Sequence, residues 1–176
     1  MLRGHIDFDP DLGKWWMDLD FSQAPIDTDL LRQYYELNGA TYATWQDQRP
    51  VWRCFDVPPA VTQSIHAQMS SWPSDVSWAM HRTDPGTLVP IHGDHYQYLM
   101  ARYPDRGADE IERFVFFVED RHPGHIIEVH GELLPDWKAG DWVNWRGQAP
   151  HTIANLGFLP RFSLVATFMP NREEHQ

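Results

Sequence analysis

The sequence predicts a mainly β protein with flanking helices, arranged as a sandwich or jelly roll. From about position 76 onward, many short apolar segments are separated by turn residues, a pattern that is typical of such folds. The chain has 176 residues, which suits one domain with a sizeable core. We therefore expect a single domain over 1–176, in which a mixed lead-in over 1–80 supports a β core over 81–170.

The lead-in is expected to contain both helices and strands. Asp27, Thr28 and Asp29 can cap a first helix, which Asn38-Gly39 would stop, and Pro58-Pro59 suits the first turn of a second one. The expected elements are a helix over 30–36, strands over 41–45 and 51–55 that extend one sheet, and a helix over 58–69.

The core is expected to consist of strands punctuated by Pro-Gly, Gly-Glu and Gly-Phe turns. Residues 96–109 fit a short helix followed by a loop, and their place after the second core strand makes them a candidate lid or substrate-contact segment. The expected strands are 76–82, 87–94, 113–119, 125–130, 141–145, 151–155 and 161–169.

Composition narrows the choice of partners and compartment. The chain has 25 acidic and 14 basic residues, a net charge of −11, so nucleic-acid binding is disfavoured because phosphate contacts need clustered Lys and Arg. The only cysteine, Cys54, excludes an internal disulfide and fits a reducing cytosol. The N-terminus lacks the apolar run of a signal peptide and no segment suits a bilayer, so we expect a cytoplasmic protein without a membrane partner.

One ordered set of polar residues stands out in the second half of the chain. His92-Gly93-Asp94 comes first, His151 follows, and Arg161-Phe162-Ser163 begins ten residues after that. Because alternate residues of a strand face the same side, His92 and Asp94 can both point inward, and so can Arg161 and Ser163. Two imidazoles and one carboxylate form the ligand set of non-haem Fe(II) oxygenases. The other His-x-acid pairs, His5/Asp7 and His130/Glu132, lack these downstream partners.

With these motifs, residues from about 85 to 170 resemble the double-stranded β-helix core of the Fe(II)/2-oxoglutarate-dependent oxygenases. Similar sequence motifs occur in the prolyl-hydroxylase-like and aspartyl/asparaginyl-hydroxylase-like branches of this family. The resemblance implies a cupin-like jelly roll in which His92, Asp94 and His151 bind Fe(II). It also implies O2 and 2-oxoglutarate as co-substrates.

A 2-oxo acid held at a metal by its keto acid end projects a second carboxylate. Arg161 can pair with that carboxylate in bidentate fashion, and Ser163 adds a hydroxyl on the same strand face. Arg113 opens an apolar strand, and an Arg at a comparable place in the aspartyl-hydroxylase-like branch reaches the co-substrate or substrate carboxylate. A salt bridge from Arg113 to Glu112 or Asp109 is an equally open alternative.

The expected reaction is hydroxylation of an unactivated C–H bond in an amino acid, a peptide side chain or a small metabolite, with release of succinate and CO2. Asp94 occupies the position where a Gly or Ala would favour halogenation. Tyr98 and Trp145 flank the metal strands in sequence and are candidates for substrate contact, although most aromatic residues simply pack in the core.

Two other classes of function remain open from the sequence. Gly86 with His92, and His151 with Asn155, resemble pieces of the two motifs of cupins, which include metalloenzymes that use no 2-oxoglutarate. Cupins usually carry a second His at the position of Asp94, and a cupin site would give Arg161 no role. The third alternative is a non-catalytic jelly-roll binding protein.

Overall fold

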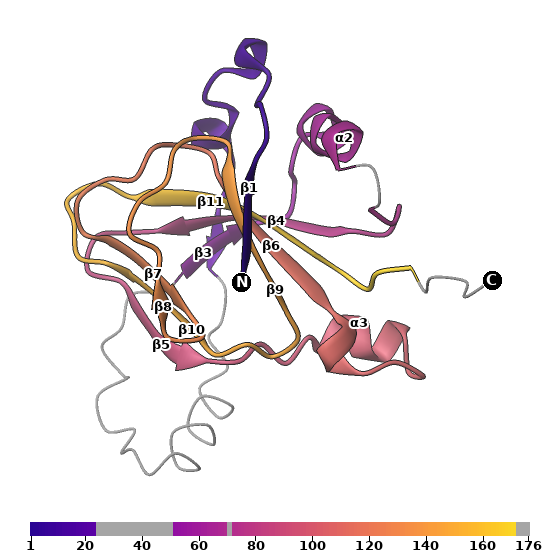
Figure 1. Ribbon diagram of the computed structural model, residues 1–176. Helices are drawn as coiled ribbons and strands as arrows, with labels where there is room; N and C mark the ends of the chain where they lie inside the picture. The colour runs from indigo at the N-terminus through magenta and orange to yellow at the C-terminus, as the bar shows by residue number, and fades with distance from the viewer. Residues whose placement is uncertain (24–50, 70–71, 172–176) are drawn as a thin grey trace.

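The computed structural model describes residues 1–23, 51–69 and 72–171, and these form two antiparallel sheets with few helices (Figure 1). The expected helix over 30–36 and strand over 41–45 lie outside the described residues. The larger sheet has the strand order β1 (Leu2–His5), β9 (Asp141–Arg146), β6 (Glu112–Phe117), β11 (Arg161–Phe168), β4 (Ser77–Thr83), β3 (Val51–Cys54) and β2 (Ser22–Gln23). The smaller sheet has the order β5 (Leu88–His92), β10 (His151–Asn155), β7 (His125–Val129) and β8 (Glu132–Leu133).

The path of the chain between the sheets defines a double-stranded β-helix. From β4 to β11 each strand lies in the sheet opposite to the one before it, except that β7 and β8 form a hairpin within the smaller sheet. This alternation confirms the predicted jelly roll. The hairpin turn is made by His130 and Gly131, whose φ angles of 54° and 77° match the positive values of a tight hairpin turn.

All seven strands predicted for the core are present, with ends shifted by at most a few residues. The predicted strand over 51–55 is also confirmed, since β3 pairs with β4 and extends the larger sheet. The short strands β1, β2 and β8 were not predicted. No residue of β1 or β8 is buried, and β2 consists of two polar residues. Pairing with a neighbouring strand, rather than their own pattern, therefore makes these segments extended.

The helices of the described residues are short. The predicted second helix is confirmed as α2 (Pro59–Gln68), and the expected helix before a loop is α3 (Gln97–Arg102). Three 3-10 turns, η1 (Pro10–Leu12), η2 (Trp15–Asp18) and η4 (Ala108–Glu110), complete the set. None of these helices has the length and apolar character needed to cross a membrane.

Strand β11 is buried along its whole length, with two chemically different faces. Phe162, Leu164, Ala166 and Phe168 belong to an apolar cluster that also contains Val61 and Ile65 of α2. The alternate residues face the other sheet, where Val165 joins a second apolar cluster with side chains from both sheets. Helix α2 therefore covers the outer face of the larger sheet, and the smaller sheet covers its inner face (Figure 1).

Replacing a buried aromatic residue of the outer cluster tests this packing. Phe116 is fully buried between the larger sheet and the elements that cover it, so we expect Phe116→Ala to lower the free energy of unfolding by about 3–5 kcal/mol. Chemical denaturation followed by tryptophan fluorescence measures the change. Phe158 is 97% exposed, and Phe158→Ala is the matched control that should leave stability almost unchanged; equal effects of the two variants would contradict the assignment of the core.

Candidate metal centre

Strand pairing brings the two predicted metal-binding histidines together. His92 is the last residue of β5 and His151 the first residue of β10, and the two are direct partners across the smaller sheet. A bulge follows His151 in this pairing. Bulges often change the direction of a side chain at a functional site. The imidazole ring centres lie 4.4 Å apart.

Asp94 lies two residues beyond His92, outside β5, and its carboxylate faces both histidines. A Cβ on Gly93 would lie 2.8 Å from the carbonyl oxygen of Gln148, closer than ordinary contacts allow. Glycine is therefore required between His92 and Asp94 for the loop to approach the segment that leads into His151.

The three side chains form a group that could hold a metal ion. Nε2 of His92 lies 3.9 Å from Asp94 Oδ1, Nε2 of His151 lies 3.5 Å from Asp94 Oδ2, and one ligand atom from each residue lies within 4.8 Å of the others. Atoms that each bind a metal at about 2.1 Å are separated by about 3.0–3.4 Å. Small side-chain movements would therefore close the group around an ion.

Hydrogen bonds to the backbone orient both imidazoles. Nδ1 of His92 lies 2.8 Å from the carbonyl oxygen of Pro90, and Nδ1 of His151 lies 2.9 Å from that of Ala149. A carbonyl only accepts, so each Nδ1 carries the proton and donates it, which leaves a lone pair on each Nε2. This is the tautomer that a metal-binding histidine needs when Nε2 is the ligand.

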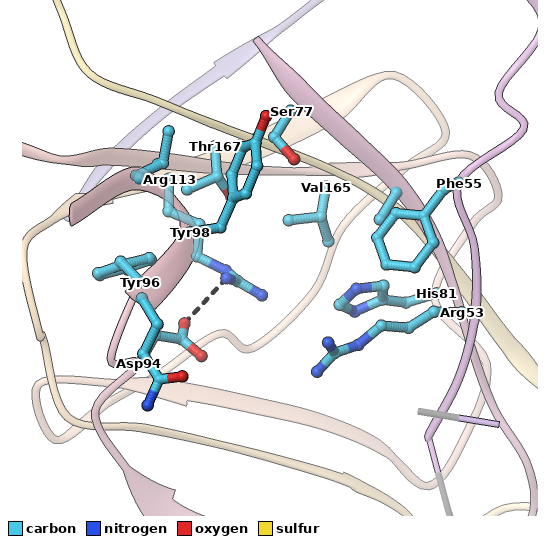
Figure 2. A pocket seen from close by; sticks show the side chains of 13 residues that line it. Arg53, Phe55, Ser77, His81, Asp94, Tyr96, Tyr98, Arg113, Val165 and Thr167 are labelled. Carbon is cyan, nitrogen blue, oxygen red and sulfur yellow. Dashed lines mark ion pairs between the residues drawn. The ribbon is translucent and has the colours of Figure 1, made fainter. Parts of the chain in front are cut away.

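Arg113 lies against the carboxylate of the group rather than against its own neighbours in sequence. Its Nη1 atom is 2.9 Å from Asp94 Oδ2, drawn as the dashed line in Figure 2. Glu112, an alternative partner expected from sequence, pairs instead with Arg146 at 2.9 Å. Burial alone would raise the pKa of Asp94, but the charge of Arg113, with smaller contributions from the two histidines, lowers that pKa to about 2. The carboxylate is therefore ionised at any physiological pH.

His151 is held neutral in the same environment. It is 6% exposed, and burial lowers its pKa to about 4 although Asp94 acts in the opposite direction. The ring of Trp145 lies 4.9 Å from the His151 ring and beneath the guanidinium of Arg113. Trp145, a predicted substrate contact, is buried against these two side chains.

Arg161 and Ser163 face the interior between the sheets, as the alternation along β11 predicts, and are both 2% exposed. The guanidinium of Arg161 donates only long hydrogen bonds, at 3.4 Å to the carbonyl oxygen of Ile126 and at 3.3 Å to the hydroxyl of Thr83. Its Nε atom has no partner among the described residues. Burial lowers the pKa of Arg161 to about 10, with Glu119 acting in the opposite direction, so the group remains charged at neutral pH.

A cavity of about 230 Å³ opens beside Asp94 and runs along the inner face of the larger sheet (Figure 2). Tyr98, predicted as a substrate contact, lines it and is 66% exposed. Trp145, Arg161 and Ser163 do not belong to the lining. The residues that do are Arg53, Phe55, Ser77, Ala79, His81, Asp94, Tyr96, Gln97, Tyr98, Leu99, Arg113, Val165 and Thr167.

Two titratable residues of this cavity, Arg53 and His81, were missed in the sequence analysis. Arg53 lies inside a predicted strand between Trp52 and Cys54, and His81 lies inside another after Met80. A titratable residue beside an apolar residue in a predicted strand was the available signal. Tyr96 is the first residue of the predicted 96–109 segment and also lines the cavity. It adopts a φ of 51° and donates a hydrogen bond to the carbonyl oxygen of Gly147 at 3.0 Å.

No protein-family model and no curated protein matches the sequence. Solved structures resemble the fold. A predicted oxalate decarboxylase from Thermotoga maritima is 15% identical with a TM-score of 0.42, covering 69% of this chain and 82% of that one. A cupin protein from Bacteroides fragilis is 15% identical with a TM-score of 0.40, covering 64% and 79%. An uncharacterised protein with a double-stranded β-helix domain from Klebsiella pneumoniae is 13% identical with a TM-score of 0.39, covering 58% and 74%. Similarity at this level gives no information about a ligand or a reaction. The fold is assigned from the strand order of this chain.

Substitution of two of the three candidate ligands tests the metal centre. We expect Asp94→Ala and His151→Ala to weaken binding of Fe(II) by at least about 100-fold, since loss of a ligand should exceed the 10–100-fold effect of losing a group that supports one. Anaerobic equilibrium dialysis measures the affinity. His95 is an exposed histidine beside the motif and lies outside the group, so His95→Ala is the control. Unchanged iron affinity in Asp94→Ala and His151→Ala would remove the assignment.

The low pKa of His151 predicts a pH dependence of stability for the metal-free protein. In the unfolded chain the imidazole titrates near its ordinary pKa of about 6.5, whereas in the folded chain it titrates at about 4. Between these values the unfolded state binds more protons, so stability falls on acidification through this range. At about 1.4 kcal/mol per pKa unit, this residue accounts for a loss of about 3 kcal/mol.

Urea denaturation between pH 7 and pH 4 in the presence of a chelator measures that loss. His151→Gln should flatten the pH dependence, because the variant side chain does not titrate, whereas His95→Gln should retain the wild-type slope. Identical slopes for wild type and His151→Gln would show that His151 is not held neutral by burial.

Proposed function

We propose that this protein is an Fe(II)- and 2-oxoglutarate-dependent oxygenase that hydroxylates an unactivated C–H bond of an amino acid, a peptide side chain or another small metabolite. The observation that carries the proposal is the buried guanidinium of Arg161. No described carboxylate forms an ion pair with it, and its two hydrogen bonds are long and end on neutral oxygens. A buried charge without a counter-charge is costly, and an anionic co-substrate would supply that counter-charge.

The placement of the residues supports this role for Arg161. The candidate metal group and Arg161 both occupy the space between the two sheets, and Ser163 lies two residues along the same inward face of β11. A guanidinium fork with a hydroxyl beside it suits a carboxylate. We assign the distal carboxylate of 2-oxoglutarate to Arg161 and Ser163, and the metal-binding role to His92, Asp94 and His151.

The remaining residues would orient and enclose the reactants. When bound, Fe(II) supplies oxidative chemistry that couples decarboxylation of the 2-oxo acid to reduction of dioxygen. Arg113 holds Oδ2 of Asp94 by an ion pair at 2.9 Å, which fixes the orientation of the carboxylate. Trp145 packs against the imidazole of His151 and excludes water from that side. The cavity beside Asp94 is the place for the primary substrate.

One observation favours a second candidate, a cupin-type metalloenzyme that uses no 2-oxoglutarate. The cavity lining contains Asp94 and Arg113 but neither Arg161 nor Ser163, so a small ligand could reach the metal group without contacting the buried arginine. In this case Arg161 would be a structural residue. The two candidates differ in what substitution of Arg161 does to stability and to co-substrate binding.

The deciding experiment is an anaerobic titration of the protein with Fe(II) and then with 2-oxoglutarate, following the visible charge-transfer band of a chelated 2-oxo acid. We expect the band in the wild type, about tenfold weaker 2-oxoglutarate binding in Arg161→Lys, and about 100-fold weaker binding in Arg161→Met. A charge-assisted hydrogen bond contributes about 1.5–3 kcal/mol, and each 1.4 kcal/mol is tenfold in affinity.

Stability measurements on the same variants separate the two candidates. If Arg161 serves a ligand, Arg161→Met should keep or raise the free energy of unfolding without 2-oxoglutarate, since it removes a buried charge that forms no ion pair with a described carboxylate. Arg82→Met on the adjacent strand is the control and should bind 2-oxoglutarate normally. Metal binding without the charge-transfer band in the wild type would favour the cupin-type enzyme. A clear loss of stability in Arg161→Met, with unaltered 2-oxoglutarate binding, would favour it as well.

A further inference from the structure

We propose that the hydroxyl of Tyr96 positions the chain segment that leads into His151, and that Tyr96 thereby raises the affinity of the candidate metal centre. The inference rests on the metal-binding part of the proposed function, which both candidate enzymes share. Tyr96 acts through the backbone and not as a ligand, so it is a positioning residue. Neither the ligand set nor the pattern of the strands assigns it this role.

A hydrogen bond of Tyr96 joins the two segments that carry the metal ligands. Tyr96 lies two residues after Asp94, and its hydroxyl donates to the carbonyl oxygen of Gly147 at 3.0 Å. Gly147 lies four residues before His151. The bond therefore ties the segment that follows Asp94 to the segment that precedes His151. Figure 2 shows Tyr96 on the same side of the cavity as Asp94.

The position of Gly147 matters because the residues that follow it orient an imidazole. The carbonyl oxygen of Ala149 accepts a hydrogen bond from Nδ1 of His151 at 2.9 Å, which leaves the Nε2 lone pair for a metal ion. Gly147 is buried, and among the described residues only Tyr96 donates a hydrogen bond to its carbonyl oxygen. Without this donor the carbonyl would lose its partner, and the segment that carries Ala149 would be held less firmly.

The backbone of Tyr96 has a conformation that residues with a side chain rarely adopt. Its φ of 51° and ψ of 32° lie in the left-handed region, where an aromatic residue is strained. Such conformations persist only when the surrounding structure holds them, and they cluster at functional sites. At this position the strain is offset by the contacts that the side chain makes.

Packing accounts for the aromatic ring of Tyr96 but not for its hydroxyl. The ring packs against the small apolar cluster of Leu99, Ile111 and Met169, which a phenylalanine would contact equally well. Burial raises the pKa of Tyr96, so the hydroxyl stays protonated and remains a donor. The bond to Gly147 is therefore the contact that distinguishes tyrosine from phenylalanine here.

The iron affinities of two matched variants test the proposal. Tyr96→Phe keeps the ring and removes only the hydroxyl. Tyr103→Phe does the same at the other end of α3, where the hydroxyl donates to Asp75 at 2.5 Å and lies outside the cavity lining. Anaerobic equilibrium dialysis with Fe(II) alone measures the affinity. We expect Tyr96→Phe to bind Fe(II) about tenfold more weakly, the lower end of the range for groups that support a ligand, and Tyr103→Phe to bind it as the wild type does.

A second measurement uses the wild type and needs no substitution at Tyr96. If its hydrogen bond strengthens metal binding, then a bound metal must strengthen the hydrogen bond by the same factor. NMR of protein with isotope-labelled tyrosine measures the exchange of the hydroxyl proton with solvent, and Zn(II) is the diamagnetic probe. We expect zinc to slow this exchange about tenfold in the wild type and to leave it unaltered in Asp94→Ala.

Two kinds of result would overturn the proposal. One is unchanged iron affinity in folded Tyr96→Phe, or an equal loss in Tyr103→Phe, which would show that any lost hydrogen bond near α3 has the same effect. The other is an identical exchange rate of the Tyr96 hydroxyl with and without zinc. This second result also decides the question if Tyr96→Phe does not fold.

The 2-oxoglutarate titration keeps these results separate from the proposed function. If the wild type binds Fe(II) but shows no charge-transfer band, the oxygenase fails, while a weaker iron affinity in Tyr96→Phe still supports the positioning role. If the band forms and Tyr96→Phe binds Fe(II) normally, the oxygenase stands and the role of Tyr96 falls. If the wild type binds no metal ion, both proposals fall.

Discussion

Strand β11 is buried on both faces, and only its inward face combines apolar packing with buried polar side chains. The outward residues join the apolar cluster beneath α2, which supplies hydrophobic stabilisation independently of the space between the sheets. The inward face can therefore carry Arg161, Ser163 and Thr167, although burying polar groups is costly. A β sandwich that relied on its inner face alone would have little room for such residues.

The polar groups between the sheets differ in how well their charges are compensated. The carboxylate of Asp94 lies 2.9 Å from the guanidinium of Arg113, so its charge is stabilised before any ligand arrives. Arg161, by contrast, contacts only neutral oxygens, and the cavity lining contains more positive than negative groups. The charge of Asp94 is therefore balanced by a described residue, whereas that of Arg161 forms no ion pair with a described carboxylate.

The candidate metal group shows how backbone geometry prepares side chains for binding. Two carbonyl groups, those of Pro90 and Ala149, fix the tautomers of the imidazoles, and the pairing of β5 with β10 fixes their separation. Gly93 lets the loop that carries Asp94 approach Gln148. These constraints arise from main-chain positions, so a single added methyl group at residue 93 would disturb the group without removing any ligand.

The sequence by itself determined the core strands, the jelly roll, and the grouping of His92, Asp94 and His151, because strand periodicity fixes which residues share a face and these motifs lie within or beside strongly patterned strands. Only the tertiary structure decided which strands became neighbours. It gave Arg113 the partner Asp94 rather than Glu112, placed Arg53 and His81 in the cavity, and left Trp145 outside its lining. The physical reason is that periodicity carries no information about register between strands distant in sequence, which depends on how both sheets pack together.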